Sequence, residues 1–588
     1  MLYPQVNKHR EKIDLSDLWK FALDYKKIGE GKGWFRGFKK FVYVAVPASW
    51  NEQILEEGFS DVNIKNYQGD VWYHRSFYVP DGWREKNIWL RVGAAYYRAK
   101  VWVNGHLLGE HEGGFLPFQF EVTDKVKIGE ENSIVIMVNN ELGLNTIPQG
   151  RPFNRVVSTW PPTTFDWFPY SGIHRPVILY TTARSHVKDI VVKTDINGKT
   201  GIIDYQVTVK CKKADSIVVS IIETGIKQFK KSGSGSLEGR IHIEKARFWY
   251  PEAPFLYNFK VEVIQGNKTV DEYIMPIGVR TIKIKANKLL LNEKPIFLRG
   301  VCKHEDFPIH GKGLNLPLLI KDYSLLKWLG ANTVRCTHYP YAEEMLQLAD
   351  KNGILLMDEV PAFNLLGDHL NNALKATHKK MLKELISRDR NHPSIISWFV
   401  ANEPYYTDGS NINIKPSRKV SAYFRDICRY VKQLDERPVT IAMATNRDEC
   451  LLRYCDIASV NRYYGWYHYP GRIEEGCREL SKKLDQLYRK LKKPILLSEF
   501  GADALSGAHG NPPEMFTEEF QTEFLTRTMK MIESKPYIIG ELIWCFADFK
   551  TPQSSFRMIF NRKGIFTRDR QPKMAAHKVR EHWRRMKK

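Results

Sequence analysis

The sequence of 588 residues predicts three consecutive domains, namely a β-sandwich, an immunoglobulin-like β-sandwich and a (β/α)8 barrel. Length is the first observation, since about 150 residues is usual for one domain. The second is that short alternating runs broken by turn residues fill the first half of the chain. The third is that apolar runs alternate with amphipathic segments in the second half. We expect the domains at residues 1–183, 184–283 and 284–588.

The first half of the chain is patterned for antiparallel strands. Its first part contains VWYHRSFYVP, IWLRVGAAYYRAKVWVNG, SIVIMVNN and HRPVILYTT. Alternating apolar and polar residues are typical of strands with one buried face. From about residue 186 the pattern repeats in shorter strands such as VKDIVVKT and SIVVSII, enough for one immunoglobulin-like sandwich. Two β domains therefore precede the barrel.

The second half of the chain contains eight candidate barrel strands. They are IFLRGVC, ANTVRCT, GILLMDEV, IISWFVANE, PVTIAMAT, ASVNRYY, PILLSEF and GELIWCFADF. Helical stretches such as LIKDYSLLKWLG and EEFQTEFLTRTMKMIES lie between them, and PKMAAHKVREHW supplies a last helix. This order matches a (β/α)8 barrel.

The net charge of +23 is compatible with a nucleic-acid partner, an anionic small substrate or a lysine-rich solvated surface. No recognisable nucleic-acid-binding module occurs in the sequence, so we expect no nucleic acid. The start of the chain lacks the apolar stretch of a signal peptide, and no later segment has about 18 apolar residues in a row. We therefore expect a soluble cytoplasmic protein with no membrane contact.

The eight cysteines form no CxxC pair and no clustered His/Cys spacing of the kind that a zinc site needs. We interpret them as free thiols in a reducing compartment. No metal and no cofactor are expected.

Two glutamates close apolar runs of the predicted barrel. Glu403 follows the apolar run in IISWFVANEP and Glu499 lies in PILLSEFG, 96 residues later, which is three barrel units of about 32 residues. Their strands are therefore the fourth and the seventh, whose carboxyl ends meet at one mouth. A separation of about 5 to 5.5 Å would give glycoside hydrolysis with retention. One such glutamate alone would be read as a salt-bridged loop residue, but two in register favour a catalytic pair.

The chain resembles the β-glucuronidases of glycoside hydrolase family 2 over almost its whole length. YYRAKVWVNGHLLGEHEGGFLPF, NHPSIISWFVANEP and ILLSEFG carry the resemblance. It implies a jelly-roll, sugar-binding-like first domain, with Glu403 as general acid/base and Glu499 as nucleophile. A neighbouring ionised carboxylate would raise the pKa of the proton donor. The resemblance also implies that Asn402, otherwise an ordinary turn residue, bonds the sugar 2-hydroxyl.

The resemblance extends to a cluster of residues around the sugar. In NRYYGWYHY it implies that Tyr463 bonds the nucleophile and that Asn461 and Tyr467 shape the pocket. His338, after the second strand, and Asp166, from the first domain, are implied to reach the sugar. Trp544, after the eighth strand, can form an apolar floor. The alternatives are loop packing for the aromatic cluster, a satisfied polar histidine and a core tryptophan.

A basic loop after the eighth strand reads RMIFNRKGIFTRDRQPK. Its Asn561 and Lys563 match the Asn-x-Lys motif that binds the C6 carboxylate in the resembling enzymes, and Arg557 is expected to assist. A buried ammonium and amide give charge-assisted hydrogen bonds that a neutral hydroxymethyl group cannot replace. The alternative is an ordinary basic loop on a basic protein.

The sequence therefore predicts a retaining exo-β-glucuronidase that acts on small-molecule or oligosaccharide β-glucuronides through a covalent glycosyl-enzyme. A β-galacturonidase or β-galactosidase of the same family stays open, because galacturonides also carry a C6 carboxylate. A non-catalytic carbohydrate-binding protein is the alternative from another class.

One segment departs from some bacterial members of the family. After the third strand, DEVPAFNLLGDHLNNALKATHKK enters the next helix without a long active-site insertion. The aglycone side is expected to be open or to be completed by a neighbouring subunit. Family members are commonly oligomers, so we expect a homo-oligomer.

Overall fold

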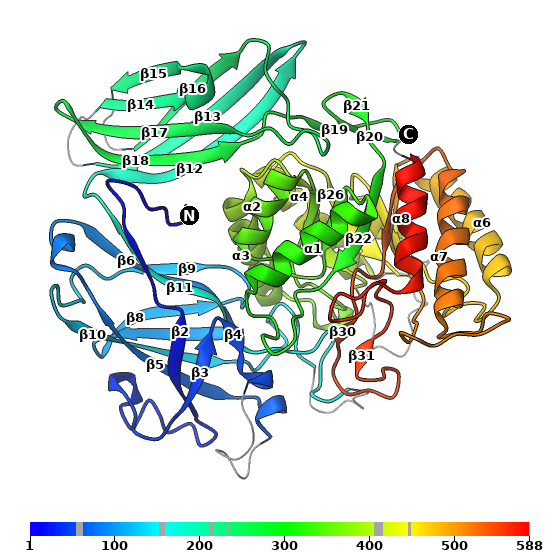
Figure 1. Ribbon diagram of the computed structural model, residues 1–588, viewed down its shortest axis with the longest axis horizontal. Helices are drawn as coiled ribbons and strands as arrows, with labels where there is room; N and C mark the ends of the chain where they lie inside the picture. Colours follow the sequence, from blue (N-terminus) through cyan, green and yellow to red (C-terminus); the bar gives the residue numbers. More distant parts are fainter. Residues whose placement is uncertain are drawn as a thin grey trace.

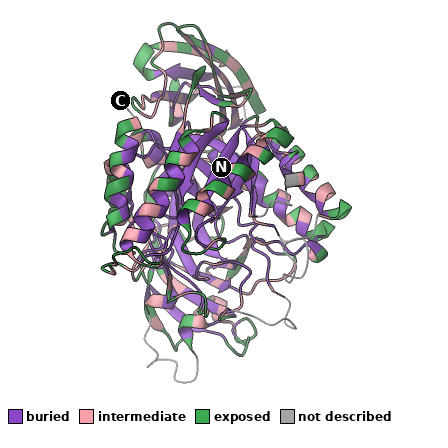
Figure 2. Cartoon of the chain, turned by 90° about the vertical axis from the view of Figure 1, so that its right-hand side faces the viewer, coloured by how far each residue is buried: buried purple, intermediate pink, exposed green. Residues whose placement is uncertain are grey.

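The computed structural model of the protein describes residues 1–53, 63–151, 159–211, 216–231, 235–404, 416–444 and 449–586. Two β-sandwiches lie one above the other beside a helix-covered barrel (Figure 1). Buried residues fill the interior, and exposed positions lie on the outward faces of the helices (Figure 2). The predicted fold class and domain order are confirmed.

The first sandwich packs two antiparallel sheets face to face. One sheet has the order β1-β11-β6-β9, with β4 paired to β11, and the other has the order β3-β2-β5-β10-β7-β8. Leu90 and Val177 from the first sheet and Phe21 and Tyr73 from the second meet in a buried core. The strands are β1 Lys12–Asp14, β2 Asp17–Leu23, β3 Val42–Val46, β4 Ala48–Ser49, β5 Asp70–Tyr78, β6 Asn87–Tyr96, β7 Arg98–Val103, β8 His106–Glu112, β9 Phe118–Glu121, β10 Glu131–Asn139 and β11 Gly172–Thr182.

The second sandwich has a three-stranded sheet, β12-β13-β16, and a four-stranded sheet, β15-β14-β17-β18. In β13 (TGIIDYQVTVK) buried and half-buried positions alternate along nearly the whole strand. Period-two burial of this kind places every second side chain in the core. The strands are β12 His186–Asn197, β13 Thr200–Lys210, β14 Ser216–Ile221, β15 Ile226–Lys231, β16 Gly235–Ile243, β17 Tyr257–Gln265 and β18 Lys268–Ile277.

Eight parallel strands, β22 to β29, close into a barrel in chain order. Helices cover the outside of these strands, so both strand faces are buried and the strands read as continuous apolar runs. A small sheet of β19 Ile282–Lys285, β20 Lys288–Leu291 and β21 Lys294–Pro295 precedes the barrel. The barrel strands are β22 Leu298–Lys303, β23 Thr333–Cys336, β24 Leu355–Glu359, β25 Ile395–Asn402, β26 Val439–Met443, β27 Ala458–Asn461, β28 Ile495–Phe500 and β29 Ile538–Ile543.

The barrel helices pack apolar side chains against the barrel, and capping side chains begin α1, α3, α4 and α7. In α4 the buried residues Val420, Phe424, Ile427 and Val431 recur every three or four positions, and Ser417 caps the first turn by accepting from Val420 N. The helices are α1 Leu316–Leu329, α2 Glu343–Asn352, α3 Asn372–Asp389, α4 Arg418–Leu434, α5 Glu449–Leu452, α6 Ile473–Leu491, α7 Glu518–Glu533 and α8 Met574–Met586. Among these described helices, none has the length and apolar content needed to cross a membrane.

A segment of the first sandwich reaches the barrel mouth. Phe168 N donates to the carbonyl of Lys550 at 2.9 Å, and Trp160 pairs with Gln553 through two backbone hydrogen bonds. Lys550 belongs to β30 Phe549–Lys550, which pairs with β31 Phe560–Asn561. These contacts hold the segment around Asp166 against the loop that carries Asn561.

Candidate active site

A cavity of about 220 Å³ lies at the carboxyl ends of the barrel strands and is closed on one side by the first sandwich. Three predicted residues, Asn402, Asn461 and Lys563, do not line it but lie behind it, bonded to lining residues or to one another. The structure therefore brings all the predicted site residues together. Those that line the cavity are Asp166, His338, Glu403, Tyr463, Tyr467, Glu499, Trp544, Arg557 and Asn561.

Glu403 follows β25 directly and Glu499 lies near the end of β28, as predicted. Glu403 has a φ of 45°, a conformation that is uncommon for a residue with a side chain and is found at functional sites. Its Oε1 accepts a hydrogen bond from Asn461 Nδ2 at 2.6 Å. Both carboxyl groups line the same cavity.

Glu499 accepts from strong donors at both oxygens. Arg335 Nη1 donates to Oε1 at 2.7 Å, and the Tyr463 hydroxyl donates to Oε2 at 2.7 Å. His338 Nε2 lies 3.9 Å from Oε1. Charge-assisted contacts of this kind favour the ionised form of a carboxyl group.

Burial raises the pKa of both carboxyl groups, and Arg335 opposes this rise at both. At Glu403 the main cause is burial, to which Asp166 adds, whereas we had predicted that the neighbouring carboxylate would be the cause. Glu403 accepts from one neutral amide, while Glu499 accepts from a guanidinium and a phenol. We therefore assign the negative charge of the pair to Glu499 and the proton to Glu403.

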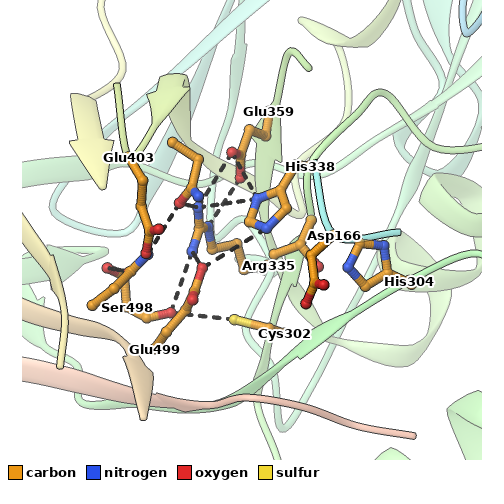
Figure 3. Close-up of polar contacts among 12 residues, drawn as sticks. Asp166, Cys302, His304, Arg335, His338, Glu359, Glu403, Ser498 and Glu499 are labelled. Carbon is orange, nitrogen blue, oxygen red and sulfur yellow. Dashed lines mark hydrogen bonds and ion pairs between the residues drawn. The ribbon is translucent and has the colours of Figure 1, made fainter. Parts of the chain in front are cut away.

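Arg335, on β23, was missed by the sequence analysis and organises the floor of the site. In Figure 3 it lies between Glu359 and Glu499. It is fully buried, donates to Glu359 at 3.0 and 3.2 Å, and donates to Asn402 Oδ1 at 2.7 Å. The sequence could have predicted this role, because a charged residue within a buried strand needs a partner. The adjacent strand, LLMDE, ends with Glu359, which can be that partner.

His338 is neutral and oriented. Burial, with the charge of Arg335, holds its pKa well below the ordinary value. Its Nδ1 lies 3.0 Å from Glu359 Oε1, so the ring proton belongs on Nδ1 and Nε2 is an acceptor. The ring stacks on Trp544 at 5.2 Å between centroids with an angle of 19° between the planes.

His304 also lines the cavity and was missed by the sequence analysis. Burial holds its pKa well below the ordinary value, so the ring is neutral. Its Nδ1 lies 3.1 Å from the Tyr339 hydroxyl, and its buried Nε2 has no hydrogen-bond partner among the described residues. This nitrogen is therefore available to a ligand in the cavity.

Two domains meet at Asp166. Arg557 donates to its carboxylate from Nε at 3.2 Å and from Nη2 at 2.8 Å, and Asn561 Nδ2 donates to it at 3.0 Å. Asp166 comes from the first sandwich and the other two from the barrel. In this structure Asp166 thus holds the predicted carboxylate-binding residues in place.

Lys563 is almost fully buried, with 1% of its surface exposed. Its Nζ donates to the Tyr467 hydroxyl at 3.0 Å and forms an ion pair with Asp503. Asp503, which was missed by the sequence analysis, lies four residues after Glu499. The ammonium therefore lies at the edge of the cavity, next to a residue that lines it.

Two carboxyl groups that face one cavity at the mouth of a (β/α)8 barrel are the arrangement of a glycoside hydrolase. The family descriptions agree with this class. "Glycosyl hydrolases family 2, sugar binding domain" matches residues 13–183, "Glycosyl hydrolases family 2" matches residues 185–280, and "Glycosyl hydrolases family 2, TIM barrel domain" matches residues 282–588. The chain belongs to glycoside hydrolase family 2.

Three similar proteins are named β-glucuronidase. A β-glucuronidase of Paenibacillus borealis is 38% identical over 610 residues, which cover 100% of this chain and 99% of the relative. A β-glucuronidase of Canis lupus familiaris is 38% identical over 615 residues, covering 99% and 92%. The solved structure of a Ruminococcus gnavus β-glucuronidase in complex with D-glucuronic acid has a TM-score of 0.90 and 35% identity, covering 99% of both chains.

Proposed function

We propose that this chain is a retaining, exo-acting β-glucuronidase that hydrolyses β-D-glucuronides to glucuronic acid and an aglycone. The observation that carries the proposal is that two cations, Arg557 and Lys563, lie with the Asn561 amide in the same site as Glu403 and Glu499. Similarity over the whole chain to proteins named β-glucuronidase, one of them solved with D-glucuronic acid, supports it.

In the first step the Glu499 carboxylate attacks the anomeric carbon and the glycosidic bond breaks. Glu403 transfers its proton to the departing oxygen, so the aglycone leaves as a neutral alcohol or phenol. Arg335 and Tyr463 support this step by keeping Glu499 ionised and oriented. The product is a glucuronyl ester of Glu499.

In the second step the Glu403 carboxylate removes a proton from a water molecule, and the oxygen of that water attacks the anomeric carbon. Glu499 leaves as a carboxylate and the anomeric configuration is retained. Each of the two steps inverts the anomeric carbon and uses only the carboxyl groups of Glu403 and Glu499. We therefore expect that EDTA leaves the rate of hydrolysis unchanged.

Neutral groups around the cavity suit a sugar ring. Asn402 Nδ2 is buried without a hydrogen-bond partner among the described residues, so it can donate to the 2-hydroxyl, where a bond strengthens in the transition state. His338 Nε2 is an acceptor for another hydroxyl. Trp544 offers an apolar face for the ring.

At the C6 end, Asn561, Lys563 and Arg557 are the proposed carboxylate-binding residues, with Tyr467 between the lysine and the cavity. A uronate gains charge-assisted bonds there that a hydroxymethyl group cannot make. The small cavity suits one sugar unit and therefore exo action. The 12 residues between β24 and α3, 360–371, form a short connection, which supports an open aglycone side.

We also propose a cytoplasmic location and a homo-oligomer. The free state of seven cysteines, Cys211, Cys302, Cys336, Cys428, Cys455, Cys477 and Cys545, supports a reducing compartment. Large exposed apolar side chains such as Phe229 and Ile309 support a subunit contact. Light scattering on the purified protein tests the second point, and a single-chain mass would contradict it.

A panel of nitrophenyl glycosides tests the substrate. We expect rapid hydrolysis of the β-D-glucuronide and little hydrolysis of the β-D-galactoside. Faster hydrolysis of the β-D-galacturonide would favour the galacturonidase alternative, and hydrolysis of none would favour a carbohydrate-binding protein. For the mechanism, a 2-deoxy-2-fluoro-β-D-glucuronyl fluoride is expected to label Glu499, as peptide mass spectrometry can show, and a label on another residue would contradict it.

A further inference from the structure

Lys563 lies against a carboxylate for which the proposed chemical steps have no role. Both Lys563 and Asp503 are buried, with 1% and 5% of their surfaces exposed. The Lys563 ammonium is paired with Asp503 Oδ2 and donates to the Tyr467 hydroxyl at 3.0 Å. An ammonium has three N–H donors, so these two contacts leave one for a ligand.

Asp503 is itself held at its other oxygen. Its Oδ1 accepts from the backbone N–H of Arg562, next to Lys563, at 2.9 Å. Burial would raise the pKa of Asp503, but the charges of Lys563 and Arg557 and these hydrogen bonds hold it below its ordinary value. An ionised Asp503 therefore ties the loop after β28 to both the backbone and the side chain of the Arg562–Lys563 segment.

A buried ammonium is costly without a counter-ion. Asp503 supplies that counter-ion. It keeps Lys563 in one place before substrate binds, which reduces the ordering cost of binding. Asp503 does not line the cavity, whereas Tyr467, the other partner of Lys563, does. Asp503 therefore acts on a ligand through its neighbours, of which Lys563 is the cation that it contacts directly.

We propose that Asp503 is a positioning residue for uronate selectivity, which fixes the Lys563 ammonium beside Tyr467 where the ammonium can meet the C6 carboxylate. The inference rests on the proposed function, because only a uronate substrate would use this contact.

Asp503→Asn keeps the size of the side chain and removes its charge. For the nitrophenyl β-D-glucuronide we expect kcat/KM to fall about tenfold, through KM, with kcat within about twofold of wild type. For the nitrophenyl β-D-galactoside, which has no carboxylate, we expect a change of less than about twofold. An equal loss on both substrates, or no loss on either, would overturn the proposal.

Asp548→Asn is the matched control. Asp548 is buried and accepts from Lys573 Nζ at 2.8 Å and from Gly564 N at 3.0 Å, so it supports the same loop. Its hydrogen bonds and ion pairs within the described part of the chain do not include Lys563. We expect its ratio of glucuronide to galactoside activity to equal that of wild type. A shift as large as that of Asp503→Asn would assign the effect to the loop and overturn the proposal.

If Asp503→Asn alone does not fold, two other variants test the inference, Lys563→Met and the double variant Asp503→Asn/Lys563→Met. The double variant buries no unpaired ammonium, so we expect it to fold. If Asp503 acts through Lys563, both variants have the same selectivity ratio. A lower ratio in the double variant would contradict the inference. If the wild-type protein hydrolyses no glucuronide, the proposed function is refuted. If the wild-type protein is active but Asp503→Asn leaves the ratio of glucuronide to galactoside activity unchanged, this inference alone is refuted.

Discussion

The two ends of the cavity are built differently. Glu403, Glu499 and Arg335 belong to or directly follow parallel strands of one barrel, and Arg335 is fully buried. Arg557 and Lys563 come from a long loop, in which Phe556 is 80% exposed, and they are held by carboxylates from elsewhere in the chain.

This difference separates chemistry from selectivity. Barrel strands fix the reacting carboxyl groups with little freedom, whereas the loop can change its residues without disturbing the strands. We expect variants at the strand end to lose turnover on every substrate. Variants at the loop end are expected to lose preference for one substrate class, and the following predictions test that division.

Glu499→Ala has the largest expected effect. Without the nucleophile, kcat on the nitrophenyl β-D-glucuronide falls by about 10⁴-fold or more. Added azide is expected to restore turnover and to give the α-glycosyl azide, detectable by NMR, because a small anion can enter the space that the carboxylate leaves. Calorimetry checks that the variant is folded. A folded variant with wild-type turnover would contradict the role of Glu499.

Lys563→Ala follows. Loss of charge-assisted bonds to the uronate lowers kcat/KM for the glucuronide by about 100-fold. Activity on the galactoside changes little, since its C6 hydroxyl gains nothing from the ammonium. Initial rates on both substrates give the ratio. An equal loss of activity on both substrates would contradict the division between a catalytic end and a selectivity end of the cavity.

Tyr463→Phe removes one donor from Glu499 and has a smaller effect, about tenfold in kcat/KM. Because the Tyr463 bond lowers the pKa of Glu499, its loss raises that pKa. Glu499 must be ionised to react, so the acidic limb of the pH profile of kcat/KM moves to higher pH. The alkaline limb, set by Glu403, stays in place. A shift of the acidic limb to lower pH would show that the Tyr463 bond does not stabilise the anion.

Phe556→Ser has the smallest expected effect. An exposed side chain contributes less than about 0.5 kcal/mol to stability, so Tm stays close to that of wild type. Differential scanning calorimetry measures it. A fall of several degrees would mean that this part of the loop is covered in solution by another subunit.

The sequence was sufficient to predict those site residues that lie at the ends of barrel strands. Glu403 and Glu499 follow or close buried runs, so the barrel pattern alone predicted that they meet at one mouth, whereas Tyr463 was predicted from the family resemblance. Arg335 and Glu359 could have been found by asking how a charge inside a buried strand is paired. Asp503 could not, because its contact with Lys563 spans 60 residues and depends on the path of a loop. The main cause of the raised pKa of Glu403 is burial, which only the packed structure reveals.

The contact between Asp166 and Asn561 has a consequence for synthesis of the protein. The two residues are 395 positions apart, and Asp166 leaves the ribosome long before the loop that carries Asn561. Domains generally fold in the order in which they are made. The first sandwich is therefore folded while the C6 end of the site does not yet exist. A nascent chain that stops before residue 561 would present a folded domain and most of the barrel, but no complete uronate site.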